Sequence, residues 1–297
     1  MSNPQPPPSD PFAEPQISSR PANIRWKLKG SSDGPIYRGG DMVKPCVGCG
    51  QREFVPPPPK PFTRHAPRFE RAVVWPWLST AARWVELRYS IRSVQEHFAD
   101  KDCPFYVLTD APPAWRNEFP RVEWIAMKGY KHSREMGLFQ AFELGMQIAD
   151  SVLWMNDDIY LLRDQDWLDF DVALTEGDLT HKGPSLLRSG NVWQQGLGGA
   201  VETLKILGRN QVWRFATHTP YLFEREKSLE IFETFHLPYK GGWVTLYHNW
   251  HRTAHQPCGR AKVNRLPTND PMARFLNHSA AMPDSATRAD LIRRFGQ

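Results

Sequence analysis

The sequence has little cysteine and no long apolar run. Four of its 297 residues are Cys, and they show no disulfide framework. No run of about eighteen apolar residues is present, so no segment is expected to span a bilayer. The start at Met1 has neither the basic region nor the apolar region of a secretory signal. These absences predict a cytoplasmic protein.

Aromatic residues are plentiful, and charge is unevenly distributed. The chain has 12 Trp and 16 Phe in 297 residues, a composition that favours a packed α/β enzyme over a disordered or coiled chain. The formal net charge of +5 conceals basic ends, residues 1–67 and 252–297, around an acidic middle. Basic arms favour anionic partners such as nucleotide phosphates, nucleic acid or acidic glycans, although an ordinary solvated surface gives the same pattern.

Residues 1–67 form a Pro-rich arm. The runs Pro6–Pro8 and Pro56–Pro59 favour polyproline II and supply no donors for a β-ladder, so the arm is expected to be a linker or adaptor. Between the runs, residues 23–28 and 35–43 offer a small hairpin.

Cys46 and Cys49 in the same arm have the spacing of a zinc knuckle. A structural zinc site needs four ligands, and no second Cys-x-x-Cys follows. His65 is one further candidate ligand. The alternative is a reduced pair of cysteines in a loop.

Residues 68–297 are expected to form the folded domain. Strands are predicted at residues 72–78, 105–110, 122–127 and 151–155, from short apolar runs that end at Pro or polar residues. Helices are predicted at residues 84–98 and 135–149, where apolar residues recur at helical spacing. The order strand, helix, strand, strand, helix, strand predicts an α/β fold with a mostly parallel sheet flanked by helices.

The stretch from Ser151 to Leu162 organises the domain. It runs from an apolar segment directly into Asn156, Asp157 and Asp158 and then becomes apolar again. Two adjacent carboxylates near apolar surroundings repel each other unless they are neutralised, which a divalent cation such as Mg²⁺ or Mn²⁺ would do. The alternative is a solvated turn whose residues serve turn chemistry.

Polar or flat aromatic residues end three of the predicted strands. Trp75 and Trp77 end the first, Asp110 the second and Asn156 the fourth. Ligands of parallel sheets bind beyond the carboxyl ends of the strands, so these residues predict a nucleotide cleft. The alternative is that Trp75 and Trp77 belong to the core.

Several of these segments together resemble a known family. Residues 84–97 read Trp-Val-Glu-Leu-Arg-Tyr-Ser-Ile-Arg-Ser-Val-Gln-Glu-His, and residues 106–110 and 153–160 follow as Tyr-Val-Leu-Thr-Asp and Leu-Trp-Met-Asn-Asp-Asp-Ile-Tyr. This order resembles the second conserved block of the Stealth family. The segment His218-Thr-Pro220 is similar to that family's later His-x-Pro block. The resemblance covers roughly residues 71–235.

The resemblance implies a GT-A fold and a nucleotide-sugar transferase, the known members passing a sugar-1-phosphate to a glycan hydroxyl. The chain departs from the family where Thr-Trp-Val-Asp-Gly is replaced by Trp-Pro-Trp-Leu-Ser at residues 75–79, and where Lys-His-Ser-Arg-Glu at 131–135 replaces an Asn-rich segment. Ordinary GT-A glycosyltransferases share the same plan, so transfer of the sugar alone, most simply from a UDP-sugar, stays open.

This chemistry requires groups that stabilise a leaving phosphate. Asp157 and Asp158 are expected to hold a metal, with Asp158 essential for catalysis. A late His often completes the metal site of GT-A enzymes, and the resemblance places His248 or His251 there. Arg88 and Arg92, four residues apart on one helix face, are candidate phosphate partners or surface cations.

A general base is needed for the acceptor, and His218 is the first candidate because His titrates near neutral pH. The acceptor is expected to be a glycan or small molecule, and next a hydroxymethylated base in DNA, for which the basic arms would neutralise phosphates. A different class of function stays open, a non-catalytic module that binds a glycan or nucleic acid.

Overall fold

The computed structural model describes residues 26–27, 53–54 and 67–296, except 83, 128–133, 236–241 and 279–282. The chain divides into two units, residues 1–58 and 59–297. In the first, β1 (Trp26–Lys27) pairs antiparallel with β2 (Glu53–Phe54), whereas the sequence predicted residues 35–43 as the partner strand. Residues 35–43 and the candidate zinc ligands Cys46, Cys49 and His65 lie outside the described residues. The boundary at residues 67/68 stays a prediction.

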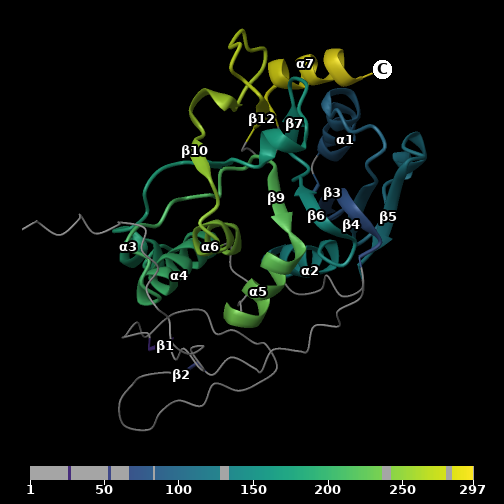
Figure 1. Cartoon of the computed structure of the whole chain (residues 1–297). Helices are drawn as coiled ribbons and strands as arrows, with labels where there is room; N and C mark the ends of the chain where they lie inside the picture. The colour runs from purple at the N-terminus through teal and green to yellow at the C-terminus, as the bar shows by residue number, and fades with distance from the viewer. Residues whose placement is uncertain are drawn as a thin grey trace, which may run out of the picture. The chain divides into compact units, whose positions relative to one another are not determined.

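A five-stranded sheet forms the centre of the second unit, in the order β5-β4-β3-β6-β9 (Figure 1). Its strands are β3 (Phe69–Trp77), β4 (Phe105–Thr109), β5 (Val122–Ala126), β6 (Ala149–Trp154) and β9 (Tyr221–Glu224). The first four are mutually parallel, and β9 is antiparallel to β6. The prediction of a mostly parallel sheet is confirmed.

Side chains of β3 alternate between two cores, because successive residues of a strand point to opposite faces. Ala72 and Val74 join one hydrophobic cluster, with Phe142 of α2. Val73 and Trp75 join the other, with residues of α1. Helices therefore cover both faces of the sheet, which explains why β3 reads as a continuous apolar run.

Seven α-helices lie among the described residues: α1 (Glu86–His97), α2 (Arg134–Gly145), α3 (Gly183–Leu187), α4 (Val192–Ile206), α5 (Arg225–Phe235), α6 (Trp243–Trp250) and α7 (Ser285–Phe295). Three short 3-10 helices are η1 (Ala114–Glu118), η2 (Trp167–Phe170) and η3 (Gly259–Ala261). The predicted helices at 84–98 and 135–149 correspond to α1 and α2. The second was predicted too long, since Ala149 begins β6.

Two smaller sheets complete the unit. One contains β7 (Ile159–Leu161), β11 (Lys262–Val263) and β12 (Phe275–Asn277), and the other β8 (Ala173–Thr175) and β10 (His255–Pro257). In the first, β12 runs antiparallel to β7. Because β7 follows β6 almost directly, this sheet brings the late part of the chain to the end of β6.

The C-terminal helix α7 packs near α1 (Figure 1). Asp284 caps it by accepting from the Thr287 N–H at 2.8 Å, as expected of an N-cap aspartate. Arg92 of α1 donates to the Phe295 carbonyl at 2.7 Å. Helix α1, which contains most of the segment 84–97 that resembles the Stealth family, is thus in contact with α7 near the end of the chain.

Candidate functional site

A turn with two carboxylates lies at the carboxyl edge of the central sheet. Asn156, Asp157 and Asp158 connect β6 to β7, and the Ile159 N–H closes the turn by donating to the Asn156 carbonyl at 3.2 Å. We call residues 156–159 the acidic turn. Asn156, Asp157 and Asp158 are each half-buried. Ligands of parallel sheets bind at this edge, so the acidic turn stands where a ligand is expected.

Two later segments reach the same edge. Tyr221 at the start of β9 lies opposite Trp154 at the end of β6, so the residues just before Tyr221, including His218, continue toward the acidic turn. Asn277 of β12 lies opposite Ile159, and its Nδ2 donates to the Asp158 carbonyl at 3.2 Å. The next residue along the chain from Asn277 is a histidine, His278.

Two further titratable residues, Glu86 and His278, come from segments next to the acidic turn. Glu86 at the start of α1 is 5% exposed, and burial raises the pKa of its carboxyl, with the negative Asp158 raising it further and His278 opposing both. Nε2 of the buried His278 lies 3.4 Å from the Tyr160 hydroxyl. Both residues were missed by the sequence reasoning, although Glu86 is part of the Glu-Leu-Arg-Tyr-Ser motif and His278 follows a short apolar run.

His248 and His251, the predicted late metal ligands, lie on and just after α6. His248 is 2% exposed, its Nδ1 lies 3.2 Å from the Thr253 hydroxyl, and burial lowers its pKa to about 3. Nε2 of His251 lies 3.0 Å from the Lys227 carbonyl. Among the described residues neither ring is seen to contact the acidic turn, whereas Asn277, the residue before His278, is hydrogen-bonded to the Asp158 carbonyl.

His218 has a left-handed backbone, with φ at 53°, a conformation that non-glycine residues adopt rarely and that costs free energy. Its N–H donates to the buried Tyr221 hydroxyl at 2.8 Å, and burial raises the pKa of that hydroxyl to about 12. Lys262 donates to the neighbouring Thr217 carbonyl at 2.6 Å. The loop is thereby held in one conformation at the sheet edge.

The aromatic and acidic ends of β3 and β4 have structural partners. Trp75 is fully buried and its Nε1 donates to the Ser90 hydroxyl at 3.0 Å, while Trp77 is 7% exposed and packs near Trp115. The Asp110 carboxylate accepts from both the N–H and the hydroxyl of Ser79, each at 2.7 Å. Asp110 therefore ties the loop after β3 to the end of β4, and Trp75 belongs to the core.

Arg88 and Arg92 both bind Glu118 of η1. Arg88 approaches its carboxylate to 2.7 Å and Arg92 to 2.9 Å. A donor phosphate would have to compete with Glu118 for either guanidinium. Their role as phosphate partners stays a prediction.

The residues at the acidic turn fit a divalent cation by their chemistry. Carboxylate and amide oxygens suit Mg²⁺ and Mn²⁺. Asp157 and Asp158 supply carboxylates, and His278 would add an imidazole nitrogen. Asn277 adds Oδ1, a buried oxygen that has no hydrogen-bond partner within the described ranges. The same ranges contain no preformed cluster of three or more His, Cys, Asp or Glu ligands, so binding would have to draw the side chains together.

Searches with protein-family models and against curated protein sequences gave no match. Solved structures do resemble the chain. The galactosyltransferase LgtC, determined with donor and acceptor sugar analogues, is 14% identical with a TM-score of 0.44 and covers 76% of this chain and 96% of its own. WbbM, a bifunctional glycosyltransferase, is 12% identical with a TM-score of 0.43, covering 77% and 48%.

GlyE of Streptococcus pneumoniae, a glycosyltransferase in its apo form, is 13% identical with a TM-score of 0.38, covering 71% of this chain and 55% of its own. At such identities and scores the site chemistry of these proteins does not transfer to this chain. Within the described ranges no helix is both long and apolar enough to cross a membrane.

Proposed function

We propose that the chain is a glycosyltransferase that uses a nucleotide sugar and a divalent cation. The observation that supports this best is the acidic turn at the carboxyl edge of a parallel sheet, with the segment bearing His278 hydrogen-bonded to it through Asn277. One or two carboxylates together with substrate phosphates usually hold Mg²⁺, and ligands of parallel sheets bind at this edge, so a nucleotide diphosphate is the ligand class that fits. A non-catalytic module that binds a glycan or nucleic acid does not require this cluster of titratable groups.

Each residue at the edge has a proposed role. Asp157, Asp158 and His278 would hold the cation, which when bound supplies positive charge against the leaving phosphate. His218 remains the first candidate to accept the acceptor's proton, since its loop runs to the same edge. Glu86 is the second candidate, because burial raises the pKa of its carboxyl and so strengthens it as a proton acceptor.

An acceptor has space beside the His218 loop. An open hollow of about 390 Å³ is lined by Glu176, Lys262 and Asn264 among others. Lys262 binds Glu176 at 3.3 Å and the Thr217 carbonyl at 2.6 Å, so its ammonium group already has hydrogen-bond partners. A hollow of this kind suits a neutral hydroxylated molecule such as a glycan. The DNA acceptor stays a prediction, since most of the basic arm 1–67 lies outside the described residues.

The test is cation and donor binding by the purified full chain. We expect Mn²⁺ to bind in the presence of UDP, measured by electron paramagnetic resonance of the free ion, and a panel of UDP-sugars to be consumed only when Mn²⁺ or Mg²⁺ is present. Absence of both Mn²⁺ binding and donor turnover would refute the proposal.

A matched pair of histidine variants tests the assignment of ligands. His278→Asn should weaken Mn²⁺ binding at least tenfold, as removal of a ligand or its close support does in other sites. His251→Asn should leave it unchanged, because that ring contacts α5 instead. The reverse result would restore the ligand set predicted from the sequence.

Transfer of a sugar-1-phosphate is a second candidate. This reaction is the one that the resemblance of residues 84–97 to the Stealth family implies. Three residues of that segment, Glu86, Ser90 and Ser93, lie close to the acidic turn and β7. The two reactions release different nucleotides from a UDP-sugar. Chromatography of the products that shows UDP indicates sugar transfer, and UMP indicates sugar-1-phosphate transfer.

A further inference from the structure

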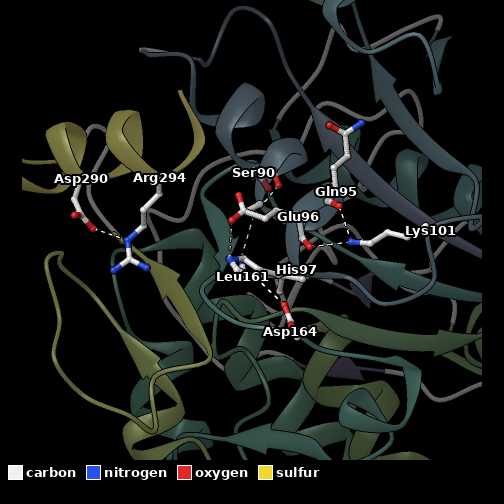
Figure 2. A network of polar contacts seen from close by, with 10 residues as sticks. Ser90, Gln95, Glu96, His97, Lys101, Leu161, Asp164, Asp290 and Arg294 are labelled. Atoms are coloured by element: carbon white, nitrogen blue, oxygen red, sulfur yellow. Dashed lines mark hydrogen bonds and ion pairs between the residues drawn. The ribbon is translucent and has the colours of Figure 1, made fainter. Parts of the chain in front are cut away.

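Two serines of α1 contact the strand that follows the acidic turn. Ser90 and Ser93 are both 0% exposed. The Ser90 hydroxyl donates to the Ile159 carbonyl at 2.6 Å, and the Ser93 hydroxyl accepts from the Leu161 N–H at 3.1 Å. Figure 2 shows Ser90 and Leu161 within the polar network around α1. One helix thus binds alternate residues of β7.

The hydrogen bonds of Ser90 differ from those that serines usually make in helices. A helical serine commonly donates to a carbonyl of its own preceding turn, as Ser228 does to the Glu224 carbonyl at 2.8 Å and Ser93 to the Ser90 carbonyl at 2.7 Å. Ser90 has a single proton, and it gives this proton to Ile159 on another element. It accepts in turn from Trp75 Nε1 at 3.0 Å.

Ser90 also lies at both ends of the acidic turn. Its hydroxyl oxygen is 2.6 Å from the Ile159 carbonyl oxygen and 3.5 Å from that of Asn156, the two residues that the turn's own hydrogen bond joins. A chain of bonds therefore runs from the buried Trp75 of β3 through Ser90 to the turn that carries Asp157 and Asp158. Trp75, Ser90 and Ile159 are fully buried, and an unmet hydrogen bond is costly for a group withdrawn from water.

The helix that carries these serines is itself firmly held. Lys101 donates to the carbonyls of Gln95 and Glu96 at the end of α1, at 2.7 and 2.8 Å (Figure 2). Such a cation at a helix C-terminus satisfies carbonyls that lack intrahelical partners. Lys101 therefore caps the C-terminal end of the helix that carries both serines.

We infer that Ser90 is a positioning residue that sets the geometry of the acidic turn for the cation, with Ser93 assisting through β7. The inference rests on the proposed function, because it assigns to the turn the task of holding the cation. Ser90 itself touches neither carboxylate. It acts by fixing the backbone from which both project, so its loss should weaken cation binding without removing any ligand.

The experiment compares Mn²⁺ dissociation constants, in the presence of UDP, for the full chain and its variants. Ser90→Ala should weaken Mn²⁺ binding about tenfold or more, the usual effect of removing a group that orients metal ligands. Ser90→Thr keeps the hydroxyl and should restore most of the affinity. Ser228→Ala is the matched control, since it removes an equally buried helical serine whose hydroxyl donates to the Glu224 carbonyl four residues earlier.

The outcomes separate this inference from the proposed function. If the wild-type chain binds no Mn²⁺, the proposed function fails and the inference with it. If the wild type binds and Ser90→Ala binds equally well, the positioning role alone is overturned. Should Ser90→Ala not fold, Ser93→Ala carries the same comparison, because it removes the acceptor of the Leu161 N–H, and an unchanged dissociation constant there overturns the inference.

Discussion

Replacing His248 with Met should remove a large part of the acid sensitivity of this fold. The His248 ring is 2% exposed and lies among aromatic rings, with the centroid of Phe215 4.8 Å away and that of Tyr247 5.0 Å away. Its Nε2 has no hydrogen-bond partner among the described residues. A proton added to this ring would be buried without compensation.

The sign and size of the effect follow from the pKa of His248. Burial first, and then the positive charges of His251, His255 and Lys227, together lower this pKa from 6.5 to about 3. Because the folded pKa is below the unfolded one, the unfolded state binds the proton first. Stability is fully present above pH 6.5 and is lost between pH 6.5 and pH 3. Each pKa unit corresponds to about 1.4 kcal/mol, which gives a loss of about 2 kcal/mol at pH 5.

The assay is urea denaturation at pH 7.5, 6 and 5, from which the free energy of unfolding is obtained at each pH. We expect the wild type to lose about 2 kcal/mol more than His248→Met between pH 7.5 and pH 5. His181→Gln, which replaces an exposed histidine, should follow the wild type. Parallel pH dependences of the wild type and His248→Met would refute the reasoning.

Three further results are expected. Asp158→Asn should abolish Mn²⁺-dependent nucleotide binding in a titration while leaving the melting temperature nearly unchanged, and undiminished binding would contradict the metal assignment. Phe142→Ala should lower the free energy of unfolding by about 3–5 kcal/mol, because the Phe142 ring packs on Trp243, with centroids 4.2 Å apart. A loss under about 1 kcal/mol would show that neighbouring side chains fill the space left by the ring. Glu118→Gln should weaken the half-exposed ion pairs that Glu118 forms with Arg88 and Arg92, and so lower the free energy of unfolding by about 1 kcal/mol or less. An increase in donor affinity of this variant would show that the two arginines are available to phosphate.

Local pattern was sufficient for most of the central sheet. The strand at 105–110 and the helix at 84–98 were predicted within two residues of β4 and α1 at each end. A buried strand is marked by a short apolar run, and an amphipathic helix is marked by apolar residues that recur every three or four positions. The end of α2 was predicted wrongly. Apolar residues continue from the helix through Ile148 into β6, and a pattern of apolar residues does not mark where the backbone changes conformation.

The acidic turn was also evident in the sequence, since two adjacent carboxylates near apolar surroundings repel each other unless they are neutralised. Its partners were less so. Arg88 and Arg92 share a helix face, as predicted, but that face meets Glu118, which is distant enough along the chain that helical spacing says nothing about it. The role of Asp110 in donor binding stays a prediction, and its contact with Ser79 was not evident from the sequence.

Which histidine-bearing segment meets the acidic turn was decided by tertiary structure alone. His248 and His278 each follow a short apolar run near the end of the chain, so neither composition nor spacing distinguishes them. The antiparallel pairing of β12 with β7 sets Asn277 opposite Ile159 and so brings His278 to the acidic turn, whereas α6 takes His248 into the core. Strand pairing between distant segments depends on which faces can be buried together, a property of the whole folded chain that a local stretch of sequence does not contain.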